Sequence, residues 1–236
     1  MPLAMQVVDL NIDHIVQQAK EVFPDPENAD SQGLLAAGGD LSHNMLLMAY
    51  SLGAFPWFSD GSPILWWSPD PRVIFYPGQI KLSKSLRKTI DSQKFTLTMD
   101  RAFNRVIEQC SSIDRPGQDG SWITGEMLAA YKQLHKKGFA HSVETWNGRK
   151  LVGGLYGLSI GGAFFGESMF HLETDASKVA FYHLSQKLAS WNFDFIDGQV
   201  PNPHLASLGA VEIARTSFLL LLQKSIRKKT NLGSWA

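Results

Sequence analysis

The sequence is poor in residues that build covalent or metal-held frameworks. Cys110 is the one cysteine among 236 residues, so an intrachain disulfide and a cysteine-rich zinc site are both excluded. We expect Cys110 to be a small core residue, and a chain with so little cysteine fits a reducing compartment. His171, His183 and His204 share no metal-ligand spacing on one predicted element. We therefore expect no metal centre.

Net charge and long apolar runs are also missing. The 22 basic residues balance the 22 acidic ones, so any binding to nucleic acid would need a local basic patch. The first 13 residues carry acids and no long apolar run, unlike a secretory signal. The run from Phe218 to Leu222 is far too short to cross a bilayer. We expect a soluble, cytoplasmic monomer that makes no membrane contact.

Several motifs of cofactor and nucleophile chemistry are absent as well. The chain has no phosphate-cradling glycine loop followed by Lys-Ser/Thr, and no nucleophile elbow surrounds a serine. A serine–histidine–acid arrangement stays open on composition alone. There is no internal repeat and no low-complexity tract. No cofactor is expected.

Proline and glycine divide the remaining sequence. Pro69 and Pro71 mark a boundary between a small N-terminal α+β domain, residues 1–70, and a larger domain, residues 71–236. In the first, Ser42 is a plausible N-cap of a helix that Gly53 ends, and residues 55–67 are expected to form an irregular aromatic loop.

The larger domain begins with a short strand at residues 73–76. Asp100 is a candidate cap for the following helix, and Thr124 for a later one. Asn147-Gly148 predicts a tight hairpin turn, and Gly161-Gly162 a second turn. A helix after Thr174 or Asp175 and a strand at residues 193–200 follow. This α+β order of a hairpin meander, a helix and one more strand resembles the acetyltransferase-like (GNAT-like) mixed-sheet fold.

Three polar residues stand at the ends of apolar strands beside glycines. Strand alternation places Asp197 and Gln199 on one face, about 6.6 Å apart, and the simplest pairing has the Gln199 amide donate to the Asp197 carboxylate. Glu167 ends a second apolar strand. Buried polar groups are costly unless paired, so either a structural network or a catalytic site accounts for these residues.

A basic run lies in a predicted helix that starts near Ser83. Lys84, Arg87 and Lys88 fall at i, i+3 and i+4, on one helix face, and no acid follows until Asp91. A solvated helix face and a set of phosphate contacts both account for this pattern.

Seven short stretches stand out along the chain. They are Gly38-Gly39-Asp40-Leu41, Phe55-Pro56-Trp57-Phe58-Ser59, Trp66-Trp67-Ser68-Pro69, Ser121-Trp122-Ile123-Thr124, Gly166-Glu167-Ser168-Met169-Phe170, Ile196-Asp197-Gly198-Gln199-Val200 and Ala206-Ser207-Leu208-Gly209-Ala210. Taken in order, this set resembles the leucyl/phenylalanyl-tRNA–protein transferase family, and the matches run from about Gly33 to Arg215, nearly the whole chain.

The resemblance implies a reaction and its substrates. Members of this family move leucine, phenylalanine or methionine from aminoacyl-tRNA to proteins whose first residue is lysine or arginine, which marks those proteins for N-degron proteolysis. The ester on the tRNA is already activated, so the enzyme mainly has to position an amine against a carbonyl. No metal, nucleotide or acyl cofactor is implied.

The resemblance also assigns residues. Trp57 and Trp122 would sandwich the 3′-terminal adenine, which is how unpaired bases are commonly held, although each tryptophan fits a core equally well. Three further residues match positions near the terminal nucleotide: Tyr50, Tyr131 and Asn202. The aminoacyl side chain would enter a pocket of apolar residues, for which a core reading fits equally: Phe164, Met169, Phe181 and Leu184.

In the same picture the three polar residues are catalytic. Asp197 orients Gln199 and attracts the cationic acceptor, Gln199 contacts the acceptor α-amine, and Glu167 holds an ammonium group. Gly198 and His171 stand where a cysteine and a serine are expected in relatives.

Two rival functions compete with this reading. A coenzyme-A-dependent N-acetyltransferase should carry an Arg/Gln-x-x-Gly-x-Gly/Ala loop after the central strand, where this chain has the acidic segment 171–175. A non-catalytic RNA-binding module would account for the basic helix and the tryptophans, but not for the three polar residues.

Overall fold

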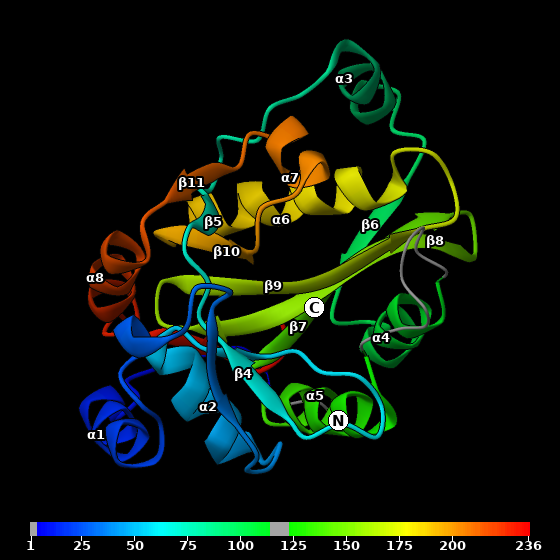
Figure 1. Cartoon of the computed structure of the whole chain (residues 1–236). Coiled ribbons are helices and arrows are strands. Elements are labelled where there is room, and N and C mark those ends of the chain that lie inside the picture. Colours follow the sequence, from blue (N-terminus) through cyan, green and yellow to red (C-terminus); the bar gives the residue numbers. More distant parts are fainter. Residues whose placement is uncertain (1–3, 114–122) are drawn as a thin grey trace.

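The computed structural model describes residues 4–113 and 123–236, which form a mixed α/β structure around a seven-stranded sheet (Figure 1). Antiparallel pairs surround one parallel pair, β9 with β10, so the sheet is mixed as predicted. In spatial order the strands are β11 (Val211–Ile213), β5 (Arg72–Phe75), β10 (Phe195–Gln199), β9 (Ala163–His171), β8 (Lys150–Ile160), β7 (Ala140–Asn147) and β6 (Thr96–Met99).

A smaller three-stranded sheet lies in the N-terminal part. It consists of β2 (Leu34–Ala37), β4 (Leu65–Trp67) and β3 (Phe55–Pro56), and α1 (Ile12–Val22), the short helix Pro26–Asn28 and α2 (His43–Leu52) accompany it. The prediction of an irregular loop from Phe55 to Trp67 is therefore wrong at both ends. Its first and last residues pair with each other, Phe55 opposite Trp67, because the Gly and Pro residues between them make the turn.

The two ends of the described chain meet. Strand β1 (Gln6–Val8) pairs with β12 (Thr230–Leu232) in an antiparallel two-stranded sheet. The N-terminal segment is thereby held against the last residues of the chain.

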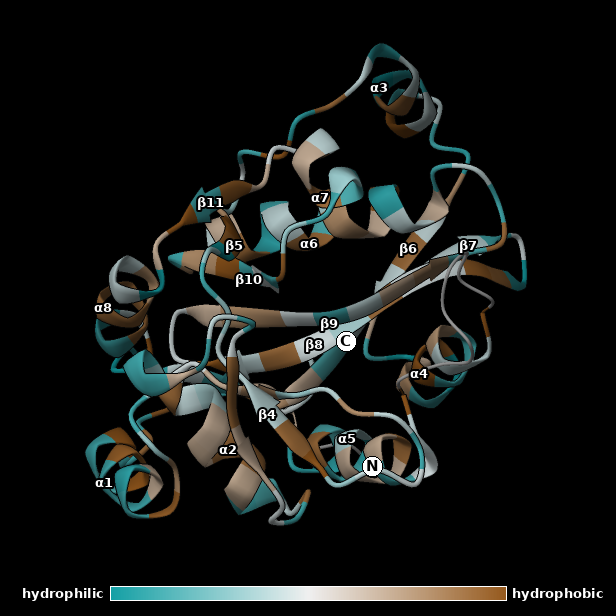
Figure 2. Ribbon diagram, in the orientation of Figure 1, coloured by the Kyte–Doolittle hydropathy of each residue, from teal (hydrophilic) through white to brown (hydrophobic). Residues whose placement is uncertain are grey.

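Helices cover both faces of the large sheet. Helix α6 (Ala176–Ser190) packs on one face, against the side chains of Phe75 and Phe164. On the other face lie α4 (Phe103–Ser112), α5 (Gly125–Lys136), α2 and α8 (Arg215–Ser225). Figure 2 shows hydrophobic residues along β5 and β10 and alternating character along α1, as expected for buried strands and a half-exposed helix.

Local sequence signals fixed several boundaries correctly. The Ser42 side chain caps α2, and Gly53 ends it with φ 87°, a left-handed conformation that glycine adopts without a steric penalty. Asn147-Gly148 makes the β7–β8 hairpin. Asp175 stands at the N-cap position of α6 as predicted, but its side chain makes no capping hydrogen bond.

The expected capping role of Asp100 is wrong. Helix α4 begins at Phe103 with no side-chain cap. The Asp100 carboxylate instead accepts hydrogen bonds from the backbone N–H groups of Ser142 and Trp235 and contacts His141. It therefore fixes the C-terminal segment to β7.

The central strands separate at the point where the polar residues lie. Strands β9 and β10 pair in parallel only as far as Phe165 and Asp197. Strand β9 then continues along β8 to His171, whereas β10 ends at Gln199. A gap therefore opens between two neighbouring strands of one sheet, beneath α6 and α7 (Pro203–Ser207). Among the described residues, no helix has the length and apolar character needed to cross a membrane.

Candidate active site

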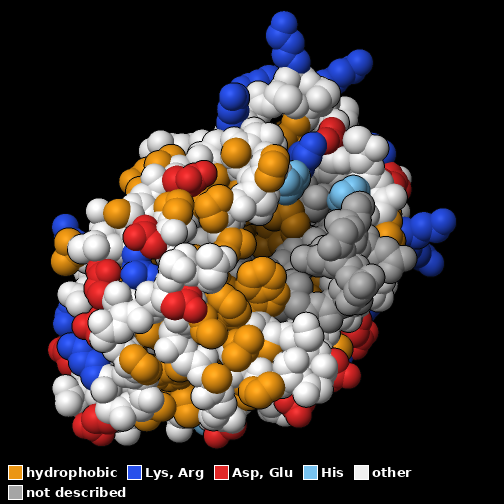
Figure 3. Space-filling view, viewed as in Figure 1, with side chains coloured by type: hydrophobic (Ala, Val, Ile, Leu, Met, Phe, Trp, Pro, Cys, Tyr) orange, Lys and Arg blue, Asp and Glu red, His pale blue; other side chains and the backbone are white. Residues whose placement is uncertain are grey.

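A pocket of about 530 Å³ opens at this gap. Its volume lies in the usual range for sites that bind small organic groups. Figure 3 shows it as a hollow lined by hydrophobic side chains. The four residues predicted to hold the aminoacyl side chain all line it: Phe164, Met169, Phe181 and Leu184. Phe164 and Met169 come from β9, and Phe181 and Leu184 come from α6, the helix that packs over the sheet at this point.

Two β-bulges aim polar side chains into this pocket. In the β8–β9 pair, Tyr156 faces Ser168 and Gly157 faces Gly166, so Glu167 is an extra residue without a partner. The β10–β5 pair skips Gly198 in the same way, and Gln199 follows with φ 64°. Bulges re-aim side chains and are common beside active sites. Both Glu167 and Gln199 line the pocket.

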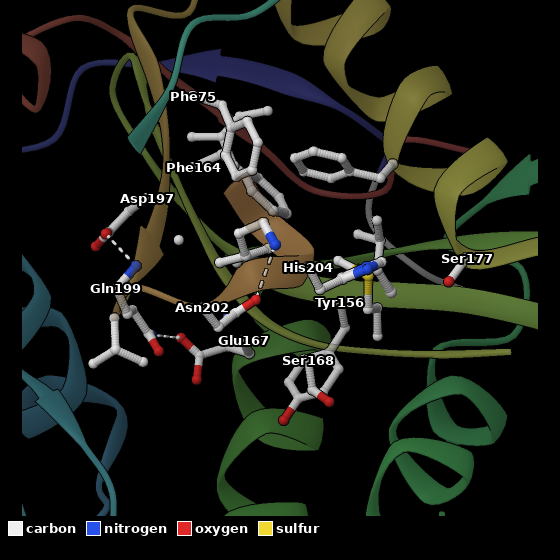
Figure 4. Close-up of a pocket in the computed structure, with 18 of the residues that line it drawn as sticks. Phe75, Tyr156, Phe164, Glu167, Ser168, Ser177, Asp197, Gln199, Asn202 and His204 are labelled. Carbon is white, nitrogen blue, oxygen red and sulfur yellow. Dashed lines mark hydrogen bonds between the residues drawn. The ribbon is translucent and has the colours of Figure 1, made fainter. Parts of the chain in front are cut away.

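Glu167 is the centre of a buried hydrogen-bond network. The Tyr50 hydroxyl donates to its Oε1 atom at 2.6 Å, and the Tyr131 hydroxyl donates to its Oε2 atom at 3.0 Å. The Gln199 amide nitrogen donates to Oε1 at 3.0 Å (Figure 4). Burial raises the pKa of Glu167 to about 7, although these hydrogen bonds oppose the rise.

Asp197 is paired differently from the prediction. Arg72 Nε and Nη2 donate to its two carboxylate oxygens at 2.9 and 2.6 Å, and neither side chain is exposed. The Gln199 side chain does not contact Asp197. Instead the Gln199 backbone N–H donates to Asp197 Oδ1 at 2.9 Å, which holds the left-handed backbone. The predicted amide–carboxylate pairing is thus wrong, because the bulge turns the two side chains apart.

Arg72 is the residue that sequence reasoning missed. Its Nη1 atom donates to the carbonyl oxygen of Gly53 at 3.0 Å, and its guanidinium stacks on Phe55 and Phe218. Because Arg72 neutralises Asp197 and occupies both of its oxygens, Asp197 is not placed to attract a cationic acceptor as expected. The signal was available: a fully buried aspartate needs a cation, and Arg72 begins an apolar strand.

The predicted nucleotide contacts fall into three groups. Tyr50 and Tyr131 are fully buried, contact Glu167 and do not line the pocket, and their place near the terminal nucleotide stays a prediction. Trp57 is 38% exposed and lines the pocket beside Trp67, and Asn202, the N-cap of α7, lines it too. Trp122 lies outside the described residues.

The basic helix α3 (Lys84–Asp91) stands apart from the pocket. Ser83 caps it, and its three basic residues Lys84, Arg87 and Lys88 are exposed and form no ion pair with a described residue. In Figure 3 blue side chains project from the part of the molecule that α3 occupies in Figure 1. Within residues 4–113 and 123–236, no group of three His, Cys, Asp or Glu side chains is arranged to hold a metal ion.

Comparison with known proteins identifies the family. The sequence model described as leucyl/phenylalanyl-tRNA protein transferase matches residues 74–223, and the model of that family's N-terminal domain matches residues 39–70. A leucyl/phenylalanyl-tRNA–protein transferase of Legionella pneumophila (strain Corby) is 54% identical over 215 residues, 91% of this chain and 96% of that relative. One from Anaeromyxobacter sp. (strain Fw109-5) is 53% identical over 213 residues, 90% of this chain and 91% of that relative.

Similarity to solved structures is more distant. A structure described as L-PGS from Bacillus licheniformis has a TM-score of 0.40 and 12% identity, and covers 82% of this chain and 64% of that one. On the strength of the sequence matches, which span nine-tenths of its length, the chain belongs to the leucyl/phenylalanyl-tRNA protein transferase family.

Proposed function

We propose that the pocket between β9 and β10 holds the aminoacyl end of a leucyl-, phenylalanyl- or methionyl-tRNA and passes its amino acid to an N-terminal lysine or arginine of an acceptor protein. Family membership makes the chain an aminoacyltransferase that uses aminoacyl-tRNA and a protein. The proposal adds the donors, the acceptors and the site. It also includes entry of the products into N-degron proteolysis, a cytoplasmic location and a monomeric state.

One observation carries the site: an apolar pocket has its polar groups concentrated on two adjacent bulges. The apolar lining suits a leucyl, phenylalanyl or methionyl side chain. The Gln199 amide nitrogen donates to Glu167, and the side-chain carbonyl oxygen of Gln199 accepts no hydrogen bond from a described residue. That oxygen is placed to accept a hydrogen bond from an amine that approaches the ester. The catalytic residues in this proposal are Glu167, Gln199 and, by positioning Gln199, Asp197.

A transfer assay tests the proposal directly. Purified protein receives leucyl-tRNA, with radiolabelled leucine, and one of four peptides that differ only in the first residue: Lys, Arg, Asp or Ala. We expect labelled leucine on the Lys and Arg peptides and little on the other two. Equal labelling of all four peptides would contradict the acceptor assignment, and no labelling of any would contradict the transfer itself.

A coenzyme-A-dependent acetyltransferase is the less favoured alternative. Such an enzyme binds pyrophosphate at a helix N-terminus, where a negative ligand meets free N–H groups. Here the segment before α6 carries Glu173, which pairs with Lys94, and Asp175 at the N-cap. Two carboxylates at that position oppose a pyrophosphate. A non-catalytic RNA-binding module is also less favoured, since it gives no reason for the network around Glu167.

The same resemblance supports two architectural proposals. We propose that residues 71–236 have an acetyltransferase-like (GNAT-like) arrangement, since the meander β6–β7–β8–β9 is followed by α6 and then by β10. We also propose a domain boundary near residue 70. The three-stranded sheet uses strands from before that point and the seven-stranded sheet uses strands from after it.

The basic helix should act through tRNA phosphates. Replacing Lys84, Arg87 and Lys88 together with alanine should weaken binding of leucyl-tRNA and phenylalanyl-tRNA to a similar degree. The slope of log affinity against log salt should become shallower by about 2–3, because each lost phosphate contact removes about 0.7–0.9. A matched variant removes three exposed lysines elsewhere, Lys20, Lys136 and Lys137. If the α3 substitutions leave the slope unchanged, or if the control changes it equally, α3 makes no phosphate contacts and is only a solvated helix face.

Trp57 should stack on the terminal adenine. Trp57→Ala should weaken aminoacyl-tRNA binding by about 1–3 kcal/mol, and Trp57→Phe should retain part of that, because phenylalanine keeps an aromatic face on which the base can stack. The same expectation holds for Trp122. Tyr76→Ala is the control, since Tyr76 is 41% exposed and does not line the pocket. If Trp57→Ala instead lowers the melting temperature while Trp57→Phe binds normally, the ring belongs to the core.

A further inference from the structure

The contacts of Glu167 require more protons than an ionised carboxylate and two hydroxyls provide. The Tyr50 and Tyr131 hydroxyls each lie within hydrogen-bond distance of a Glu167 oxygen, and the two hydroxyls lie within hydrogen-bond distance of each other. Three oxygen–oxygen contacts need three protons. Two tyrosine hydroxyls supply two, and the third exists only when Glu167 is protonated. Taking up a proton therefore completes the ring of hydrogen bonds, and losing it leaves one contact without a donor.

Glu167 also has room for one more donor. A carboxylate accepts about four hydrogen bonds. Tyr50 and Gln199 both donate to Oε1, whereas Oε2 accepts from Tyr131 alone. Because Glu167 lines the pocket, the remaining position on Oε2 is open to a ligand.

The two buried acids of the site differ in their partners. Asp197 is locked in a two-point ion pair with Arg72. Glu167 pairs with no lysine or arginine among the described residues. Burial raises the pKa of Glu167 to about 7, and the Asp197 charge adds to that rise. When the surroundings of two neighbouring acids push their pKa values apart, one of the two commonly acts as the general acid or base of the site. The titratable groups that face Glu167 are Tyr50, Tyr131 and Asp197, with Tyr156 next to Tyr131.

We propose that Glu167, held by Tyr50 and Tyr131, takes the proton from the α-ammonium group of the acceptor. This role rests on the proposed function. The ammonium gives one proton to Glu167 Oε2, and the neutral amine attacks the ester carbonyl carbon. As the C–N bond forms and the bond from carbon to the ribose oxygen breaks, the nitrogen's second proton passes to that leaving oxygen. Glu167 then releases its proton to solvent, so one proton is produced for each amide formed.

Single-turnover transfer to a lysine-initiated peptide, measured from pH 6 to 9, tests this role. Glu167→Gln keeps the shape but accepts no proton. We expect its rate at neutral pH to fall by about 100-fold or more, the usual contribution of a general base. The loss should shrink above about pH 8, where the α-amine is neutral without help. A constant loss at every pH would show a structural role only, and no loss would show that Glu167 takes no proton.

A second variant tests the role if the first folds poorly. Tyr131→Phe removes one oxygen and with it a hydrogen bond that favours ionised Glu167. Since it also breaks the ring that protonated Glu167 completes, the acid limb of the pH–rate profile should move away from its wild-type position. Tyr182→Phe, on α6 and outside the network, should leave the limb in place. An acid limb unmoved by Tyr131→Phe would overturn the proposal. A wild-type protein that transfers no amino acid would instead overturn the proposed function, and filter binding of aminoacyl-tRNA by each variant separates binding from chemistry.

Discussion

Replacing Arg72 with methionine should lower the free energy of unfolding by about 3–5 kcal/mol, because removal of one partner leaves a buried charge uncompensated. Both side chains of the Arg72–Asp197 pair are fully buried, so solvent does not screen the loss. The carbonyl of Gly53 would lose its donor as well. Chemical denaturation measures the change. A loss below about 1 kcal/mol would show that the site relaxes around the vacancy.

A double variant separates stability from positioning. Arg72→Met with Asp197→Leu removes both charges, and apolar replacements of a buried ion pair often restore stability. Transfer should nevertheless stay low, because the Gln199 N–H would lack the carboxylate that holds it. Recovery of transfer together with stability would mean that the pair supports the fold and does not position Gln199. The stability of Arg72→Lys should lie between those of the wild type and Arg72→Met, since lysine keeps the charge but does not reproduce the two-point contact.

The Arg72–Asp197 ion pair is a part of the site that the sequence did not predict. Arg72 and Asp197 are 125 residues apart, and each looks ordinary in its own segment. Pairing each buried polar group with its nearest polar neighbour in the sequence selects Gln199 as the partner of Asp197, because both lie on one short strand. Caps and turns such as Ser42 and Asn147-Gly148 depend on neighbours within a few residues, so the sequence predicts them well. A partner brought in by β5 is visible only once the strand order is known.

The alternation of side chains along a strand did not predict the two bulges either. A bulge inserts one residue and reverses which face the following side chains occupy. Alternation therefore misplaces Gln199 relative to Asp197, although the residues themselves were correctly chosen as a site. Gly166 and Gly198, which stand beside the two polar residues, were the one local hint, since glycine within a strand often marks a bulge. Similarly, Tyr50 lies 117 residues from Glu167, and no local pattern links them.

Two substitutions at Gln199 distinguish the contribution of its side chain from that of its backbone conformation. Its φ of 64° is uncommon for a residue other than glycine and costs about 1–2 kcal/mol. Gln199→Gly removes this cost and the side chain together, whereas Gln199→Ala removes the side chain only. We expect both variants to lose transfer by about 100-fold or more, as when one preorganised group is deleted from a site. Gln199→Gly should be more stable than Gln199→Ala by about 1 kcal/mol.

The comparison of these two variants decides what Gln199 does. If its carbonyl positions the acceptor amine, equal losses of transfer accompany unequal stabilities, and binding of aminoacyl-tRNA stays near normal in both. If the left-handed backbone itself matters, Gln199→Gly should retain more transfer than Gln199→Ala, because glycine adopts a φ of 64° without the steric cost that alanine carries. Asp197→Asn combined with Gln199→Ala adds a final check, since residues that act as one unit give non-additive losses. Multiplicative losses in a folded double variant would show that Asp197 acts independently of Gln199, and that its hold on the Gln199 N–H is not its contribution to transfer.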